Sequence, residues 1–251
     1  MLEEAYYNEM LDRVENSIIR NAVVTEADIK ETYYEYVQND RETYNDDIGT
    51  YEYLTQYENT TIYYVPDGYR GISLLLLEVD EELLEKHQKA LEKSGTNGSQ
   101  TMSAKQKILD SVQPTIDRIY YDLEMGNSSF RDLILQYGCD PSMAEEPTLS
   151  LGYNVHKDSI IWDPAFVEAS FSINRLMEVS APFVGQYGVY IVQYVRDVPF
   201  GPVEFTKEIQ ASLYDDTLSR KQNDMFNETM EQWMNESVIL YAPEAQKIME
   251  K

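Results

Sequence analysis

The sequence of 251 residues has one cysteine, Cys139, and two histidines, His87 and His156. A single cysteine excludes an intrachain disulfide framework and a cysteine-rich zinc site. Two histidines give little support to a histidine-based metal site or catalytic triad, and no Asp-x-Asp-x-Asp-Gly calcium loop is present. We therefore expect neither a metal nor a cofactor, and we expect Cys139 to be an inert free thiol.

Basic residues are scarce as well. Lysine and arginine together number 20 against 45 aspartates and glutamates, which gives a formal net charge of −25. Such a surface repels nucleic acid and anionic lipid, so we expect no nucleic-acid partner. The hydrophobic content of 43% is nevertheless enough for buried cores and argues against a disordered acidic chain. The composition indicates a folded protein whose partners are neutral or basic.

Long hydrophobic runs are missing too. The longest aliphatic run, Leu74–Leu77, is far too short to cross a membrane and predicts the middle of a buried strand. No apolar signal-peptide core precedes Leu2, and the residues after it read as the interior of a helix. We expect an export segment, with a possible membrane tether, upstream of these residues.

Tyrosine is abundant, with 21 residues that cluster near Tyr6, around Tyr33 and between Tyr51 and Tyr64. Tyrosine is amphipathic and suits surfaces that contact varied, partly unfolded chains. The alternative is that these side chains fill small helical cores with polar rims.

Apolar periodicity and turn residues predict an α+β protein. Residues 39–50 are expected to be turn-rich, residues 51–65 extended, and residues 94–100 a flexible linker. Strands are expected at 72–79, 180–184 and 187–195, and helices at 2–21, 25–38, 81–93, 104–125, 129–136, 163–172 and within 203–241. The helices at the two ends are predicted to pack together into one module, with the sheet-containing segment inserted between them.

Four segments carry a resemblance to a known family. They are PDGYRGISLLL (66–76), GNSSFRDLILQYGCD (126–140), WDPAFVEASF (162–171) and VSAPFVGQYGVYI (179–191). In this order they resemble the motifs of parvulin-type peptidyl-prolyl isomerases, and the whole layout resembles exported foldases of the PrsA/SurA kind. The resemblance implies an N-terminal part of a helical chaperone module at 1–64, a parvulin-like domain with a small antiparallel sheet flanked by helices at 65–198, with an insertion at 81–103, and the C-terminal part of the module at 199–251.

The resemblance also implies a site. Leu151, Trp162 and Phe166 fall at the positions of an apolar cup for proline, and Asp140 falls at its catalytic rim. Two histidines of the family are replaced here by Leu74 and Tyr190, and we expect Tyr190 to contact substrate.

A third family position, a serine or threonine beside the second histidine, is Gly185 in this sequence. Rotation about an X-Pro bond needs no nucleophile or metal, so these replacements leave two alternatives. One is an extracytoplasmic isomerase that acts on proline-containing unfolded chains through an open cup. The other is a holdase whose cup is closed by Tyr190.

The sequence is also compatible with a simpler function and with self-association. An acidic interaction domain without clients and a homodimer formed by the helical ends are both compatible with the sequence. His87 is expected to face solvent, and His156 to lie in a loop after Leu151.

Overall fold

The computed structural model describes residues 2–236, with side chains from residue 5 onward. Within these residues the chain forms two compact units. Residues 2–36 and 204–236 form one, called here the helical unit, and residues 37–203 form the other, called the sheet unit. The predicted boundaries at 64/65 and 198/199 remain a prediction, and the sheet unit also takes in residues 37–64.

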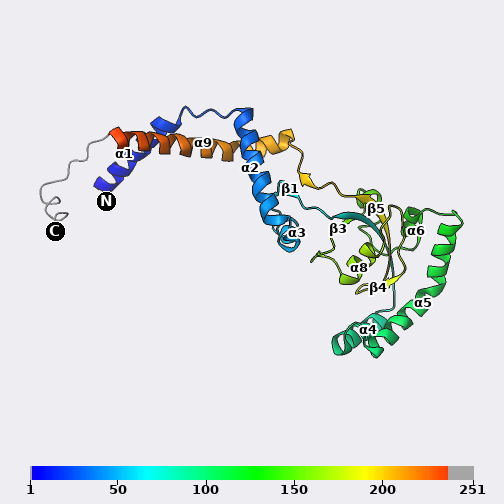
Figure 1. The fold of residues 1–251 in the computed structure, drawn as a ribbon. Coiled ribbons are helices and arrows are strands. Elements are labelled where there is room, and N and C mark those ends of the chain that lie inside the picture. The colour runs from blue at the N-terminus through cyan, green and yellow to red at the C-terminus, as the bar shows by residue number, and fades with distance from the viewer. Residues whose placement is uncertain (1, 237–251) are drawn as a thin grey trace. The chain divides into compact units, whose positions relative to one another are not determined.

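The helical unit contains α1 (Leu2–Ile19), the first part of α2 (Glu26–Tyr44) and α9 (Lys207–Glu236), with α1 beside α9 (Figure 1). The capping box at the start of α2 is formed, because the Thr25 amide donates to Asp28 Oδ2 over 2.7 Å. Several side-chain contacts join α2 to α9, and two of them lie in the first two turns of α2. Lys221 Nζ lies 2.6 Å from Asp28 Oδ2, and Thr217 Oγ1 donates to Thr32 Oγ1 over 3.1 Å. Residues 237–241 of the predicted last helix lie outside the described residues.

The sheet unit is built on a four-stranded antiparallel sheet in the order β3-β2-β5-β4. The two long central strands, β2 (Arg70–Leu77) and β5 (Val189–Asp197), fall where the apolar runs predict them. The edge strands β3 (Tyr153–Val155) and β4 (Phe183–Val184) are short, and a separate antiparallel pair joins β1 (Tyr64–Val65) to β6 (Gly201–Pro202). The helices of this unit are α3 (Ile48–Gln56), α4 (Glu81–Ser94), α5 (Ser99–Glu124), α6 (Phe130–Tyr137), α7 (Thr148–Leu151) and α8 (Pro164–Ser172). The predicted α+β class with a small antiparallel sheet is confirmed.

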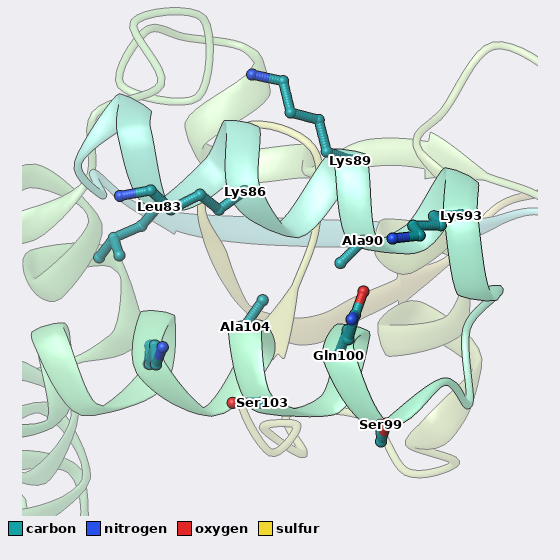
Figure 2. Close-up of a pocket in the computed structure, with 10 residues that line it drawn as sticks. Leu83, Lys86, Lys89, Ala90, Lys93, Ser99, Gln100, Ser103 and Ala104 are labelled. Carbon is teal, nitrogen blue, oxygen red and sulfur yellow. The ribbon is translucent and has the colours of Figure 1, made fainter.

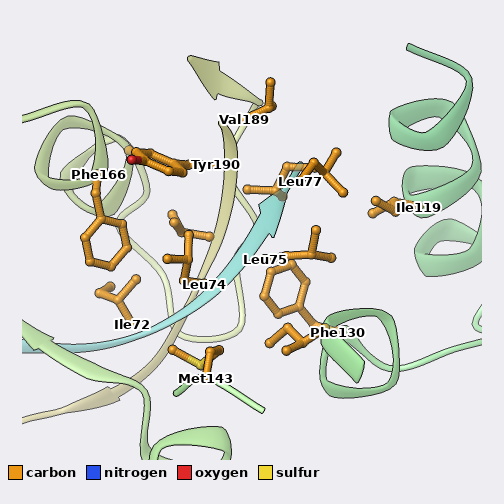
Figure 3. Packing of buried hydrophobic residues seen from close by; sticks show 14 of the residues in the cluster. Ile72, Leu74, Leu75, Leu77, Ile119, Phe130, Met143, Phe166, Val189 and Tyr190 are labelled. Atoms are coloured by element: carbon orange, nitrogen blue, oxygen red, sulfur yellow. The ribbon is translucent and has the colours of Figure 1, made fainter. Parts of the chain in front are cut away.

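The alternation of side chains along β2 gives the sheet two apolar faces (Figure 3). Leu74 lies toward α8 and Phe166, whereas Leu75 lies toward α6 and Phe130. Because both faces are covered, β2 reads as a continuous apolar run rather than as an alternating pattern. The face toward α8 is the one that carries the candidate site.

Residues 39–65 differ from the expectation of a turn followed by extended chain. Helix α2 continues to Tyr44, and α3 occupies Ile48–Gln56. Asp47 caps α3 by accepting a hydrogen bond from the Thr50 amide over 3.0 Å, and Ile48 and Glu52 are buried one turn apart. Burial of this face outweighs the strand preference of tyrosine and threonine.

The predicted insertion at 81–103 contains α4 and the start of α5, and these two helices lie side by side as a hairpin (Figure 2). Thr101 closes the turn between the helices by hydrogen-bonding through Oγ1 to the carbonyls of Ala90 and Gly95, over 3.0 and 2.8 Å. The expectation that His87 faces solvent is wrong, because its side chain lies on the buried face of α4. Burial lowers the pKa of His87, so it is held in the neutral form.

Candidate functional site

A cavity of about 620 Å³ opens in the sheet unit beside α8, and we call it the α8 cavity. It brings together four of the five predicted site residues: Asp140, Trp162, Phe166 and Tyr190. Its other lining residues are Leu74, Leu76, Cys139, Pro141, Tyr153, Ile160, Ile161, Asp163, Pro164, Gln186 and Tyr187. The lining therefore combines apolar and aromatic side chains with two carboxylates and contains no lysine, arginine or histidine.

One wall of the α8 cavity, called here the aromatic wall, is formed by side chains whose rings contact one another: Tyr153, Trp162, Phe166 and Tyr190. Trp162 and Phe166 meet edge to face, with ring centroids 5.4 Å apart and planes at 79°. The Tyr153 ring lies 4.8 Å from the Trp162 ring with the planes tilted at 45°, and the Tyr190 ring lies 6.2 Å from the Phe166 ring. The Trp162 indole donates from Nε1 to the carbonyl of Asn154 over 3.0 Å, which fixes the ring plane. The wall is thus preorganised for a flat or cyclic apolar group.

Leu151 is not part of this wall, in contrast to the prediction. It ends the short helix α7, its side chain is 45% exposed, and its carbonyl accepts a hydrogen bond from Arg196 Nε over 3.0 Å. Tyr153, two residues further along the chain on β3, supplies the wall position instead. The physical reason is that the chain turns at Gly152, with φ +68°, before it enters the sheet.

Asp140 is held at the cavity by Tyr153. The Tyr153 hydroxyl donates to Asp140 Oδ2 over 2.9 Å, and the Ser142 amide donates to Oδ1 over 3.0 Å. Burial, together with the neighbouring Asp140 charge, raises the pKa of Tyr153 far above neutral pH. Tyr153 is therefore a neutral phenol that donates a hydrogen bond to Asp140.

A second tyrosine–carboxylate pair, which the sequence reasoning missed, also lines the cavity. Asp163 caps α8 by accepting from the Ala165 amide over 2.9 Å, and its Oδ2 accepts from the Tyr190 hydroxyl and the Gln186 amide, both over 2.6 Å. Burial and the hydrogen bond to Asp163 raise the pKa of Tyr190. Tyr190 therefore lies in the wall, anchored by its hydroxyl, and leaves the cavity volume free. The signal for Asp163 in the sequence is that it directly precedes the proline that begins α8.

The Tyr190 ring also explains why position 185 has no side chain. A Cβ atom on Gly185 would lie 2.1 Å from Tyr190 Cε2 and 2.6 Å from Asp163 Oδ2. The ring and carboxylate thus fill the space that a serine or threonine at this position would need. The replacements at 185 and 190 are physically coupled.

Cys139 and His156 are the two other reactive side chains considered from the sequence. Cys139 lines the cavity, but partial burial and the nearby Glu78 charge raise the pKa of its thiol. His156 is buried outside the α8 cavity, where Nδ1 accepts from the Asp158 amide over 3.0 Å and Nε2 lies 3.1 Å from the Asp67 carbonyl. It holds the turn before β2 in place.

Among residues 2–236, no group of three or more histidine, cysteine, aspartate or glutamate side chains is arranged to hold a metal ion. In the same part of the chain, no helix combines the length and apolar character that a membrane span needs.

Comparisons with known proteins give matches among solved structures alone, since no family model and no curated protein matches this chain. One match comes from work on PEB4 and the periplasmic protein Cj1289, two SurA-like chaperones of Campylobacter jejuni, at 12% identity, 96% of this chain, 73% of that chain and a TM-score of 0.36. PrsA from Bacillus subtilis matches at 16% identity over 100% of this chain and 91% of that chain, with a TM-score of 0.28.

The peptidylprolyl isomerase PrsA from Bacillus anthracis matches at 14% identity over 94% of this chain and 100% of that chain, with a TM-score of 0.32. The solved structures that this chain resembles are thus of the PrsA and SurA-like kind, the same kind that the sequence motifs resemble. Because these identities and TM-scores are low, a function for this chain has to be argued from its own site.

Proposed function

We propose that this chain is an extracytoplasmic folding factor whose sheet unit catalyses cis–trans isomerisation of X-Pro bonds in unfolded polypeptides. The observation that carries the proposal is the α8 cavity, where a free volume of about 620 Å³ meets an aromatic wall and the Asp140 carboxylate. Its volume falls in the range of sites that take a small ligand group, and its wall is apolar where a proline ring would pack. The proposed location outside the cytoplasm is supported by the periplasmic description of one similar protein.

Rotation about an X-Pro bond requires neither a nucleophilic side chain nor a metal. Rotation about the X-Pro bond passes over a barrier of about 18–20 kcal/mol and breaks no covalent bond. The planar amide carries resonance charge separation that the twisted amide lacks, so an environment that excludes water favours the twisted form. A thousandfold acceleration requires about 4 kcal/mol of such preference, since each factor of ten corresponds to about 1.36 kcal/mol.

Each wall residue has a place in this scheme. Trp162 and Phe166 pack against the proline ring and exclude water from it, with Leu74 behind them on the sheet. Tyr153 and Tyr190 stay neutral and donate to their carboxylates, so proton transfer plays no part. Asp140 at the wall supplies a fixed charge beside the rotating amide.

A chaperone contribution from the helical unit is a second part of the proposal. Several large apolar side chains of this unit are exposed, and such side chains can contact unfolded chains. They are Tyr6, Tyr7, Met10, Leu11, Val14, Val23, Tyr34, Tyr214, Trp233 and Met234. If the α8 cavity bound proline segments without accelerating rotation, this surface would make the chain a holdase.

The decisive experiment is a cis-to-trans assay on short X-Pro peptides with the residue X varied. We expect a rate above the uncatalysed one that falls at least about tenfold in Phe166→Leu, because the ring that packs on proline is lost. Phe171→Leu is the matched control, since Phe171 is on the same helix and does not line the α8 cavity.

Two results separate the alternatives. No acceleration for any residue X would refute the isomerase, and suppression of client aggregation would then test the holdase. An equal loss of rate in Phe166→Leu and Phe171→Leu would place the activity elsewhere than in the α8 cavity.

A further inference from the structure

A second cavity of about 410 Å³ adjoins the α8 cavity in the sheet unit, and we call it the α3 cavity. Tyr153, Ile161 and Trp162 line both cavities, so one aromatic layer separates them. Four of the five aromatic residues that line the α3 cavity are tyrosines; the set is Tyr51, Tyr57, Tyr69, Tyr153 and Trp162. No lysine, arginine or histidine lines it.

The α3 cavity also contains a buried carboxylate. Glu52 lines the cavity and is only 3% exposed. Its Oε1 accepts from the Tyr69 hydroxyl over 3.1 Å, and its Oε2 accepts from Ser159 Oγ over 2.9 Å and from the Ile160 amide over 2.8 Å. All three donors are neutral groups, and the ion pairs formed by the described side chains do not include Glu52. The carboxylate is therefore hydrogen-bonded but has no counter-charge, which is costly for a buried ion.

The rings around Glu52 suit a cation. The ring centroids of Tyr51 and Tyr69 lie 5.9 Å apart, and those of Tyr153 and Trp162 lie 4.8 Å apart at the shared wall. The face of an aromatic ring carries negative potential, so a cation near several such faces is stabilised. An aromatic enclosure with one uncompensated carboxylate thus selects an ammonium or guanidinium group over a neutral side chain.

We propose that the α3 cavity binds the lysine or arginine side chain of the same extended polypeptide whose proline occupies the α8 cavity. This inference rests on the proposed function, and it names the substrate class: segments with a basic residue near proline. Since an extended chain rises about 3.3 Å per residue and a single aromatic layer separates the cavities, the basic residue lies two or three positions from the proline. The carboxylates of Asp140 and Asp163 at the α8 cavity and the net charge of −25 favour the same clients.

The chain carries a built-in reporter for this binding. Of its two tryptophans, Trp162 lies at the wall between the cavities and Trp233 lies on α9. In a Trp233→Phe background, the fluorescence of Trp162 can be titrated with a peptide that has one central proline and one lysine. The lysine is placed in turn at each of the first four positions on either side of the proline. Matched peptides carry norleucine in its place, which keeps the aliphatic stem and removes the charge.

We expect the lysine peptide to bind about tenfold more tightly than its norleucine match at the best position, which corresponds to about 1.4 kcal/mol. Glu52→Gln should abolish this preference, so that the lysine and norleucine peptides bind this variant equally well. Glu58→Gln is the matched control, because it removes the same charge just beyond the end of α3 at a residue outside the cavity lining. Equal affinity for the two peptides at every position, or a preference that survives Glu52→Gln, overturns the proposal.

A measurement without substitution of Glu52 covers the case in which that variant does not fold. In the Trp233→Phe protein, the lysine preference should fall as potassium chloride is raised, because salt screens the attraction. A preference independent of salt counts against a charge-selective cavity. Replacing the proline by alanine tests the other premise: if affinity is unchanged, the proposed function fails even where the lysine preference holds.

Discussion

Replacing Gly185 with alanine tests how closely the wall of the α8 cavity is built around Tyr190. The new Cβ atom would lie 2.1 Å from Tyr190 Cε2. Carbon atoms in ordinary contact are about 3.5 Å apart, so the ring edge has to move by about 1.4 Å. The Tyr190 hydroxyl is meanwhile held by a hydrogen bond of 2.6 Å to Asp163, which such a shift would break or lengthen.

The expected cost follows from these two effects. Overpacking of a filled site costs about 1–3 kcal/mol, and loss of a hydrogen bond to a charged group costs about 1.5–3 kcal/mol. A shift of the Tyr190 ring relieves the overpacking but lengthens or breaks its hydrogen bond to Asp163. We therefore expect a loss of about 2–4 kcal/mol in the free energy of unfolding. Urea denaturation followed by circular dichroism measures it.

Gly49→Ala is the control for the same chemical change. Its Cβ would lie 3.6 Å from the nearest side-chain atom, on Ile160, and α3 favours alanine over glycine by up to about 1 kcal/mol. The reasoning is tested further by Tyr190→Ala, which removes the ring. On that background Gly185→Ala should cost less than about 1 kcal/mol. Strict additivity of the two substitutions would refute the steric explanation.

Three further predictions concern other parts of the chain. Ser129→Ala removes the capping box of α6 and should lower the free energy of unfolding by about 1 kcal/mol in urea denaturation; no change would mean that the cap is dispensable. Burial lowers the pKa of His156, so the unfolded chain takes up its proton first. Stability should therefore fall as the pH drops below about 6.5, and this part of the loss should vanish in His156→Gln. The hydrogen bond from Lys221 lowers the pKa of Asp28 to about 2, so its contribution is present above pH 3.8 and is lost as the pH falls toward 2. Lys221→Met should raise that pKa in an NMR titration, and an unchanged value would rule out the pair as its cause.

Some elements follow from local sequence. The apolar runs predict β2 and β5, because a strand covered on both faces needs apolar residues throughout. The serine that caps α6 predicts where that helix begins, since its side chain bonds to the Asp132 amide within the same turn. In each case the physical cause lies within a few residues of its effect.

Other elements depend on partners far along the chain. Helix α3 reads as extended from its tyrosines and is helical because Ile48 and Glu52 are buried against distant parts of the sheet unit. The short strand β3 is defined by pairing with β2, which no local pattern of three residues reveals.

In the candidate site, too, local sequence predicts some features, whereas others depend on residues far apart in the chain. Motif order predicts the placement of Trp162 and Phe166 at the cavity wall, because both lie in one short segment, with Phe166 on α8 and Trp162 two residues before it. The partners of the polar groups are not predictable in this way. Tyr153 meets Asp140 across 13 positions, and Tyr190 meets Asp163 across 27.

The division of the chain into two units has a consequence for biosynthesis. The helical unit needs residues from both sides of the sheet unit, so α1 and α2 leave the ribosome long before α9 is made. At about 5–20 residues per second, translation of residues 37–203 occupies roughly ten to thirty seconds. During that interval the continuous sheet unit can complete its core, while the apolar faces of α1 and α2 are not yet covered by α9. Helix α9 therefore completes a unit whose first helices are made before the sheet unit.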